Sequence, residues 1–461
     1  MAPGKALEGK PYDRLFAAAG KRTGILAVAA LAAICLNAEN PNRIKPLADD
    51  YVTVCRSPDP KKVYCYTPGI CRLDSGRLVA TCDLGGSGVK GPRGRIFVSD
   101  DHGKTWRKTG EFPLCHARPF MAGGKLYILG HRGSLGALRS DDGGETWSTT
   151  ETLAEGSWHQ SACNVWYAKG NVYLVMERSI PRPDGRPCWW AVCRLEPVLM
   201  RAKETDDLTK RESWTFAESF CFDSLFGEKD PQLDYVGIPW YKTISDYCSK
   251  ADGKWKVSIP KGEAKSPPLG WLETNVVQIM DPNHVWYDPD GNAFHLFMRA
   301  NTSGAGYAAM AKVVEQPDGT MKTMLECAPS GRKMLFLPFP GGQMRFHVLW
   351  DDKTKLYWLL STQATDTLCC HDRMPKGRYN LPYDERQRMQ LSFSRNMVDW
   401  CFAGLVAAGA SVPESRHYAA MAIDGDDLVV LSRSGSPQAK SPHDGDMITF
   451  HRISDFRSLV Y

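Results

Sequence analysis

The 461-residue sequence lacks the short motifs that mark several enzyme and binding classes. It has no G-x-x-x-x-G-K-S/T loop, no dinucleotide-binding glycine pattern and no G-x-S-x-G turn, so nothing supports nucleotide binding or serine-hydrolase chemistry. No C-x₂-C, H-E-x-x-H or D-x-D-x-D-G pattern occurs either. We therefore expect no cofactor and no resident metal, although a structural calcium ion would leave no trace in the sequence. The net charge is only +5 and no basic run occurs, which argues against a nucleic-acid partner.

Long apolar runs are also absent, with one exception near the N-terminus. Residues 24–36 (GILAVAALAAICL) follow several basic residues, and this run is too short to span a membrane comfortably but typical of a signal peptide. We expect residues 1–38 to be a signal peptide, with an uncleaved membrane anchor as the alternative. The protein would then be secreted, periplasmic or on the cell surface, and would touch a membrane only through this segment. Fifteen cysteines in an exported chain predict some disulfides.

Two near-identical octapeptides stand out in the rest of the chain. Ser99–Trp106 (SDDHGKTW) and Ser140–Trp147 (SDDGGETW) fit the pattern S-x-D-x-G-x-T-W and begin 41 residues apart. The aspartate at the third position can accept hydrogen bonds from the N–H groups of a turn. The glycine permits positive φ, and the tryptophan covers the turn with apolar area. The octapeptides therefore predict two equivalent turns in a repeated structure.

Beyond about residue 50, short apolar strands alternate with turns, and no long amphipathic helix is expected. Six similar strand–turn–strand units predict an all-β, six-bladed β-propeller over residues 50–461, with seven blades as the alternative. The units cover residues 66–81, 116–130, 159–178, 283–299, 345–362 and 416–433. Residues 218–280 are expected to form an insertion, or else the seventh blade.

The octapeptides resemble the Asp-box (BNR) turns of sialidase-like propellers, and the chain resembles the sialidase (neuraminidase) superfamily over about residues 60–455. The segment Arg72–Ala80 matches the family pattern x-L-x-x-G-x-L-x-A. The segment Tyr418–Ile423, followed by Asp-Gly, is similar to the one that carries the nucleophilic tyrosine of sialidases. The resemblance implies a carbohydrate-active enzyme with Tyr418 as its nucleophile.

Three positions depart from the sialidase pattern. Tyr66 stands where an R-I-P arginine of sialidases clamps the substrate carboxylate. Arg433 stands where a glutamate braces that arginine. Residues 90–95 (KGPRGR) hold no carboxylate where the resemblance implies an acid/base aspartate. The resemblance therefore implies a sialidase-like scaffold with a rebuilt active site.

In a propeller, the starts of the first strands and the ends of the second strands meet at one mouth of the central channel. Histidines and arginines fall at many of these positions, which suits an anionic ligand. The candidate catalytic residues are Tyr418, His116, His131, Asp83 and Glu273. The candidate substrate-binding residues are Tyr66, Arg118, Arg132, His159, Arg178, His284, Arg299, Arg345, Arg416, His417 and Arg433.

Three functions fit these candidates, each with an oligosaccharide or polysaccharide partner. The first is an exo-acting glycoside hydrolase on an acidic or terminal sugar. It would use carboxylates among Asp83, Glu177, Glu273 and Asp281, with Tyr418 activated by His417 or a buried glutamate.

The second function is a lyase that cleaves uronic-acid linkages. His116, His131 or Tyr66 would act as its base, and Arg132, Arg178 or Arg299 would neutralise the uronate. The third is a non-catalytic glycan-binding propeller with Trp158, Trp271 and Trp286 as platforms.

Overall fold

The computed structural model describes residues 44–159, 163–183, 185, 191–225, 233–234, 248–258, 270–301, 306–367, 369–370, 373–374 and 384–461. The expected signal peptide, residues 1–38, lies outside these ranges. Within them, no helix is both long and apolar enough to cross a membrane. The chain divides into a short unit, Met1–Lys45, and a compact unit, Pro46–Tyr461, which carries all the strands described below.

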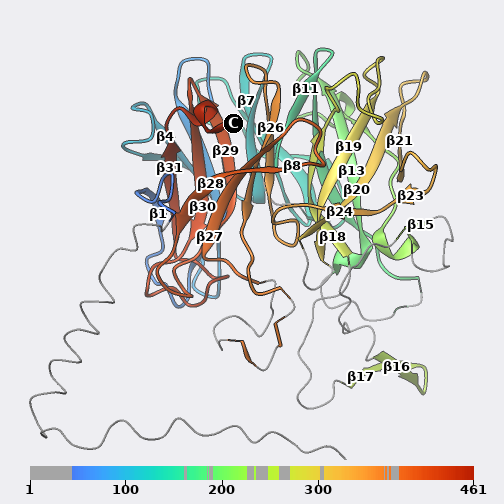
Figure 1. Cartoon of the computed structure of the whole chain (residues 1–461). Helices are drawn as coiled ribbons and strands as arrows, with labels where there is room; N and C mark the ends of the chain where they lie inside the picture. The colour runs from blue at the N-terminus through green and yellow to red at the C-terminus, as the bar shows by residue number, and fades with distance from the viewer. Residues whose placement is uncertain are drawn as a thin grey trace, which may run out of the picture. The chain divides into compact units, whose positions relative to one another are not determined.

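The compact unit is the six-bladed β-propeller that the sequence predicts, and its blades follow one another along the chain (Figure 1). Blade 1 consists of β2 (Tyr64–Arg72), β3 (Leu78–Gly85), β4 (Gly94–Ser99) and β5 (Arg107–Phe112). Blade 2 consists of β6 (Cys115–Ala122), β7 (Lys125–Arg132), β8 (Ser134–Ser140) and β9 (Glu151–Ala154). Blade 3 consists of β10 (Trp158–His159), β11 (Trp166–Ala168), β12 (Asn171–Ser179), β13 (Leu195–Lys203) and β14 (Thr215–Phe216).

The second half of the ring repeats this order. Blade 4 consists of β18 (Gly270–Val277), β19 (Ala293–Asn301), β20 (Tyr307–Glu315), β21 (Met321–Met324) and β24 (Phe336–Pro338). Blade 5 consists of β25 (His347–Asp351), β26 (Leu356–Thr362), β27 (Arg388–Ser394) and β28 (Cys401–Ala408). Blade 6 consists of β29 (Arg416–Asp424), β30 (Asp427–Ser434), β31 (Met447–Ile453) and the N-terminal strand β1 (Val52–Arg56).

A few short elements lie outside the blades. They are β15 (Leu233–Asp234), β22 (Glu326–Cys327), β23 (Lys333–Met334), the hairpin β16 (Cys248–Ala251)–β17 (Lys254–Val257), and the 3-10 helices η1 (Ala191–Arg194), η2 (Arg211–Ser213), η3 (Phe222–Leu225) and η7 (Phe456–Leu459).

Several contacts close the ring at blade 6, among them a strand pairing and the docking of a turn. Strand β1 pairs antiparallel with β31, so that blade 6 combines residues from both ends of the propeller (Figure 1). The first octapeptide then docks on blade 6, because the Trp106 ring lies 5.5 Å from the Phe450 ring and His102 Nδ1 lies 2.9 Å from Asp424 Oδ2. These contacts join blade 1 to blade 6.

Both octapeptides form the expected turns between the third and fourth strands of blades 1 and 2. Asp101 Oδ1 accepts a hydrogen bond from the Thr105 N–H at 2.9 Å, and Asp142 Oδ1 accepts the equivalent bond from Thr146 at 2.9 Å. The two turn glycines, Gly103 and Gly144, have φ of 87° and 94°. The hydrogen-bonding role predicted for the aspartates is therefore confirmed.

The predicted fourth unit is displaced along the chain. Its first strand is β18, and the segment from residue 283, which the sequence predicts as that strand, belongs to the loop between β18 and β19. All eight residues of β18 are buried, so the strand shows no alternation of apolar and polar residues that a sequence pattern could reveal. The expected insertion therefore ends before Gly270, and no seventh blade occurs among the described strands.

Two further expectations are not met in the described part of the chain. No two of its cysteines are joined by a disulfide; Cys55 and Cys65 Sγ, for example, lie 3.9 Å apart. The three tryptophans proposed as glycan platforms are core residues: Trp158 is 4% exposed, Trp271 0% and Trp286 9%. Their apolar area stabilises the blades and is not available to a ligand.

The contact between blades 1 and 6 gives a testable prediction. A Cβ on Gly103 would lie 2.2 Å from Phe450 Cζ, whereas a Cβ on Gly124, which also has positive φ, would meet nothing within 4 Å. Both Gly103→Ala and Gly124→Ala should cost about 1 kcal/mol of backbone strain, but Gly103→Ala should cost a further 1–3 kcal/mol or so by overpacking. Thermal unfolding of the two variants measures the difference. Equal losses in Tm would contradict the tight docking of this turn on blade 6.

Candidate functional site

Four first strands share an irregularity near the same mouth of the channel. In β2, β6, β18 and β29 the register of pairing shifts, and each shift contains one non-glycine residue with positive φ. These residues are Thr67 (φ 25°), His116 (51°), Glu273 (60°) and Tyr418 (51°). Such bulges re-aim side chains, at a cost of roughly 1–3 kcal/mol each. The backbone is therefore strained at three of the five candidate catalytic residues.

Tyr418, Arg299 and Glu273 form a buried hydrogen-bonded group. The Tyr418 Oη accepts a hydrogen bond from Arg299 Nη1 at 2.6 Å, and the same Nη1 lies 3.4 Å from Glu273 Oε2. Tyr418 is also hydrogen-bonded to Glu273. Because the Arg299 donor occupies one lone pair of the phenol oxygen, the Tyr418 O–H is free to point at the Glu273 carboxylate.

The pKa of Tyr418 is raised in this group, whereas the pKa of Glu273 is lowered. Burial raises the pKa of Tyr418, and the Glu273 charge adds to the effect, while three arginines oppose it. Burial also pushes the pKa of Glu273 upwards, but the Arg299 charge and the Tyr418 hydrogen bond outweigh it and hold the pKa below its usual value. At neutral pH the phenol is therefore protonated and the carboxylate ionised, the state from which a proton can pass from Tyr418 to Glu273.

Three guanidinium groups surround the Tyr418 ring. The Arg433 Cζ lies 4.2 Å from the centre of the Tyr418 ring and 4.5 Å from the centre of the Tyr66 ring. Arg386 and Arg299 lie 5.5 Å and 6.0 Å from the centre of the Tyr418 ring. The Nε atoms of Arg386 and Arg433 are buried without a hydrogen-bond partner among the described residues. The group therefore has the positive charge and the unused donors needed to bind an anion.

Sequence analysis missed Arg386. Arg386 follows a stretch of sequence without strand periodicity, so the sequence pattern does not place it at the mouth of the channel. Its contacts in the structure do. Arg386 Nη2 pairs with Asp384 Oδ1 at 2.7 Å, and its Nη1 donates to His417 Nδ1 at 3.0 Å. Burial and the neighbouring arginines hold the pKa of His417 well below its usual value. Because His417 accepts a hydrogen bond from an arginine, it positions Arg386 and is not free at that nitrogen to act as a base towards Tyr418.

Two more buried carboxylates lie at this mouth. Asp83, at the end of β3, accepts the His116 N–H at 3.2 Å, and burial raises its pKa to about 6 although Arg433 opposes the shift. Glu177, in β12, accepts the Thr274 N–H at 3.1 Å, and burial raises its pKa as well. The environments of Asp83 and Glu273 thus shift the two pKa values in opposite directions, as in a general acid paired with an ionised carboxylate.

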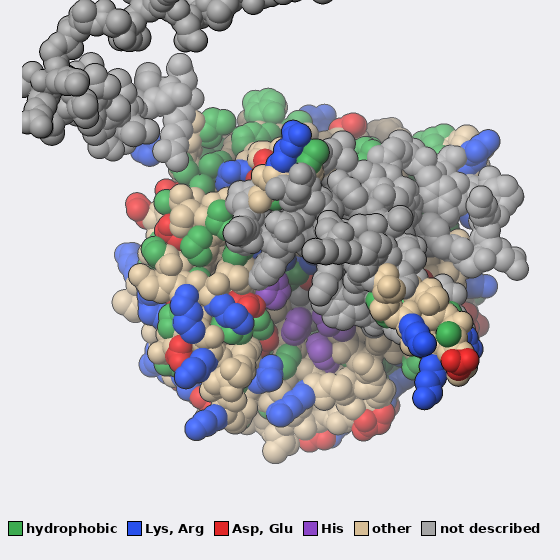
Figure 2. All heavy atoms as spheres, turned by 90° about the horizontal axis from the view of Figure 1, so that it is seen from below, with side chains coloured by type: hydrophobic (Ala, Val, Ile, Leu, Met, Phe, Trp, Pro, Cys, Tyr) green, Lys and Arg blue, Asp and Glu red, His purple; other side chains and the backbone are tan. Residues whose placement is uncertain are grey.

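Three candidate histidines form a cluster beside these carboxylates. The ring centres of His116, His131 and His159 lie 5.1–5.8 Å apart, and Figure 2 shows histidine side chains gathered at the centre of this face. Burial lowers the pKa of His131 to about 3 and that of His116 well below its usual value. These two imidazoles are therefore neutral at neutral pH, and the positive charge of the mouth comes from its arginines.

In the parts of the chain that the structure describes, no three His, Cys, Asp or Glu side chains are grouped to hold a metal ion.

Several candidate arginines hold the fold together by binding carbonyl groups. Arg118 donates to Asn164 O at 3.1 Å and to Val175 O at 2.7 Å, and thereby joins blades 2 and 3. Arg345 Nη1 donates to the carbonyls of Tyr418 and Ala419, and Arg416 donates to Ser415 O and Gly435 O. These contacts correct the ligand-binding role expected for Arg118 and Arg416, whereas Arg345 positions the Tyr418 backbone.

Three other candidates do not join the group around Tyr418. Arg178 has a 47% exposed side chain that pairs with Glu196 at 2.7 Å, and Arg132 is exposed at the end of β7. His284 lies in the loop between β18 and β19 and contacts the Trp286 ring at 4.9 Å. Because that loop joins the end of a first strand to a second strand, it lies at the opposite end of the blade, together with Asp281. The wrong placement of His284 and Asp281 follows from the displacement of the fourth unit along the sequence.

Comparison with known proteins gives matches by structure only. No protein-family model and no curated protein matches the chain. Among solved structures, the Hadza microbial sialidase Hz136 aligns with 89% of this chain and 69% of its own at 14% identity, with a TM-score of 0.51. The fold is that of the sialidase-like propellers.

Two other solved structures cover similar shares of the chain. An α-L-arabinanase of Penicillium chrysogenum, complexed with arabinobiose, aligns with 90% of this chain and 100% of its own at 12% identity and a TM-score of 0.47. A Trypanosoma rangeli sialidase in complex with sialic acid aligns with 90% of this chain and 60% of its own, at 13% identity and a TM-score of 0.48.

The raised pKa of Asp83 gives a prediction for stability. A carboxyl with a pKa of about 6 in the folded state, above its usual value of 3.8, binds its proton more tightly when folded. Its contribution to stability is present below pH 4 and is lost as the pH rises through 6. Between pH 4 and pH 7, Asp83→Asn should therefore gain roughly 2–3 kcal/mol of unfolding free energy relative to the wild type.

Denaturant unfolding of both proteins at the two pH values measures this effect. The exposed turn variant Asp74→Asn serves as the control for removal of one negative charge. A constant difference between wild type and Asp83→Asn at both pH values would contradict the raised pKa.

Proposed function

We propose that the protein is a glycoside hydrolase that uses Tyr418 as its nucleophile. The observation that supports this most directly is the Tyr418 phenol, buried and hydrogen-bonded to both Arg299 and Glu273. Glu273 takes the phenol proton as the Tyr418 oxygen forms a bond to the anomeric carbon. Arg299, 2.6 Å from that oxygen, stabilises the negative charge that develops on it.

Asp83 serves as the general acid of this proposal. Its pKa of about 6 keeps a useful fraction of the carboxyl protonated near neutral pH. The acid gives its proton to the glycosidic oxygen while the bond from that oxygen to the anomeric carbon breaks. In the second step the ionised Asp83 takes a proton from water, whose oxygen replaces Tyr418 on the sugar, and Glu273 returns the proton to the phenolate.

The substrate we propose is an acidic or terminal sugar of an oligosaccharide or polysaccharide, removed by exo-action. Three guanidinium groups lie within 6.0 Å of the centre of the Tyr418 ring, and two of them keep buried N–H donors without a protein partner in the described structure. A carboxylate on the sugar would use these donors. Export of the protein, by cleavage of residues 1–38, is part of the same proposal.

A lyase is the second candidate, and the histidine cluster favours it. Both ring nitrogens of His131 are buried without a partner among the described residues, and burial keeps the ring neutral by lowering its pKa to about 3. A neutral imidazole could remove the C5 proton of a uronate while an arginine neutralises the carboxylate. The C4–O bond then breaks, its oxygen leaves with a proton, and a C4–C5 double bond forms.

The experiment is an activity screen of the purified protein against sialylated, uronate-containing and neutral oligosaccharides. Release of reducing sugar is followed together with absorbance near 235 nm, which an unsaturated uronate produces. A hydrolase releases sugar without the absorbance. Tyr418→Phe and Glu273→Gln should then each lower kcat about 10³-fold or more, because each removes a group that acts in the transition state.

Tyr357→Phe is the matched control for Tyr418→Phe. Tyr357 is also buried and donates to Gln278 O at 2.6 Å, but it lies away from the group around Tyr418. Its variant should keep wild-type kcat. A lyase would release sugar together with a rise in absorbance near 235 nm. If His131→Ala abolishes that activity and Tyr418→Phe leaves it unchanged, the protein is a lyase instead.

A further inference from the structure

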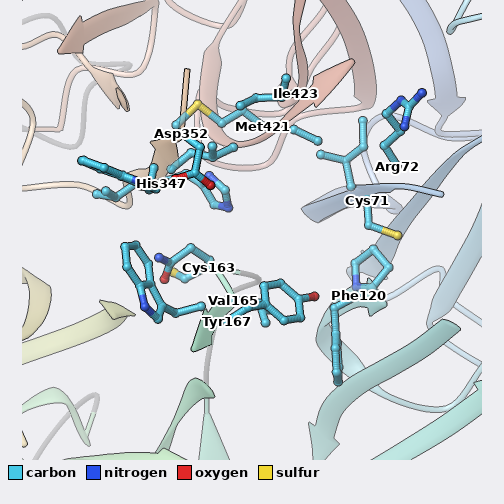
Figure 3. Close-up of a pocket in the computed structure, with 18 residues that line it drawn as sticks. Cys71, Arg72, Phe120, Cys163, Val165, Tyr167, His347, Asp352, Met421 and Ile423 are labelled. Carbon is cyan, nitrogen blue, oxygen red and sulfur yellow. Dashed lines mark hydrogen bonds between the residues drawn. The ribbon is translucent and has the colours of Figure 1, made fainter. Parts of the chain in front are cut away.

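A cavity lies at the mouth of the propeller opposite Tyr418. Its volume is about 390 Å³, and its lining includes Ile70–Arg72 of β2, Phe120 of β6, Trp166 and Tyr167 of β11, His347–Trp350 of β25 and Met421–Ile423 of β29. Figure 3 shows labelled side chains from blades 1, 2, 3, 5 and 6 around one open space. The lining residues of β2 and β29 lie at the ends of these strands, whereas Tyr66 and Tyr418 lie near their starts. No residue of the group around Tyr418 lines the cavity, so it is separate from the candidate active site.

Aromatic rings form much of the wall, and their polar atoms are already bonded to the protein. Trp350 Nε1 donates to Asp352 Oδ1 at 2.9 Å, and Trp166 Nε1 donates to Gln278 Oε1 at 3.0 Å. The Tyr167 hydroxyl donates to Met121 O at 2.8 Å, although 46% of this residue is exposed. The rings are thereby fixed in orientation, and the partly exposed rings of Trp350 and Tyr167 offer their apolar faces to a ligand.

One polar group in the cavity is buried without a hydrogen-bond partner. His347 is 7% exposed, and its Nδ1 has no partner in the described structure. Burial lowers the pKa of His347 to about 3, so its ring is neutral at neutral pH and can either donate or accept a hydrogen bond. A buried nitrogen without a partner is costly, and a ligand hydroxyl that reaches it would supply the missing hydrogen bond.

The charges around the cavity do not favour an anion. The cation of the lining, Arg72, is paired through its Nε with Asp424 Oδ1 at 2.8 Å. The carboxylate of the lining, Asp352, is largely exposed, and its Oδ1 accepts a hydrogen bond from Lys355 Nζ at 3.2 Å. The cavity therefore offers aromatic faces, a neutral imidazole and an acceptor carboxylate, which together match a ring with apolar C–H faces and hydroxyl groups.

We propose that this cavity binds a neutral sugar unit, as a second carbohydrate site at the mouth opposite Tyr418. The aromatic rings contact the C–H face of the sugar, His347 bonds one hydroxyl, and Asp352 accepts from another. The volume, about 390 Å³, falls in the range of roughly 300–1,000 Å³ typical of small-molecule pockets. The proposal does not depend on catalysis at Tyr418, because it concerns other residues and binding alone.

The test is saturation-transfer NMR and calorimetric titration of the full-length protein with galactose, glucose, arabinose and glucuronate. At least one neutral sugar should bind, with a Kd in the millimolar range, and glucuronate should bind no better in this cavity. His347→Leu, which keeps the volume but removes the hydrogen bonds, should weaken the neutral sugar about tenfold or more. Tyr167→Ala, on a partly exposed ring, provides a second variant that should weaken binding without disturbing the core.

Tyr418→Phe is the control that separates the two mouths, and it should leave neutral-sugar binding unchanged. Three results would overturn the proposal. The first is that none of the three neutral sugars binds. The second is that binding is lost in Tyr418→Phe but kept in both His347→Leu and Tyr167→Ala. The third is that glucuronate binds the Tyr418→Phe protein more tightly than any neutral sugar and loses that binding in His347→Leu.

Discussion

The candidate active site depends on a backbone constraint repeated around the ring. An undisturbed first strand would alternate its side chains between the two faces of its blade. The register shift in β2, β6, β18 and β29 breaks this alternation at one level of the channel, with Thr67, His116, Glu273 and Tyr418 at positive φ. Positive φ is costly for such residues, so it persists only because the surrounding blades fix the strands on both sides. The rigidity of the propeller is thus what holds Glu273 and Tyr418 within hydrogen-bonding reach of Arg299.

The same region must also keep several charges out of water. An unpaired buried ion is expensive, and pairing offsets that cost only where hydrogen bonds satisfy most of its donors. Arg299 meets this condition through Tyr418, Glu273 and Gln343 O, and Arg386 meets part of it through Asp384 and His417. Arg433 lies between two aromatic rings, a weaker form of compensation, and its Nη2 donates to Thr67 Oγ1 at 3.3 Å. The incomplete satisfaction of Arg386 and Arg433 is understandable if a ligand anion supplies the missing partner.

Local features of the sequence were sufficient to predict the ring of blades and part of the site. The octapeptide turns and the period of the strands depend on short-range interactions, and Tyr418 could be placed by its position in a recognisable strand. Whether an arginine faces a ligand or braces the fold depends on carbonyls from other blades, which the sequence does not reveal. Arg118 of a first strand and Arg299 of a second strand were both expected to bind a ligand, yet Arg118 donates to Asn164 O and Val175 O. Arg386 was missed for the same reason. Its place in the site is fixed by its partners His417 and Asp384, and no strand periodicity in the sequence indicates it.

The contact between Tyr66 and Arg433 shows how a positive charge is kept where the chain departs from the sialidase pattern. By resemblance, position 66 should carry the arginine and position 433 the glutamate that braces it. Here a tyrosine and an arginine occupy these positions, and the Arg433 guanidinium lies 4.5 Å from the centre of the Tyr66 ring. The positive charge is therefore kept but comes from the neighbouring strand, β30 of blade 6. The brace also changes, because the hydroxyl of Tyr66 donates to Asp444 Oδ1 at 2.7 Å and so fixes the ring beneath the guanidinium. On blade 6 the charge lies 4.2 Å from the centre of the Tyr418 ring, where it favours the ionised form of the proposed nucleophile.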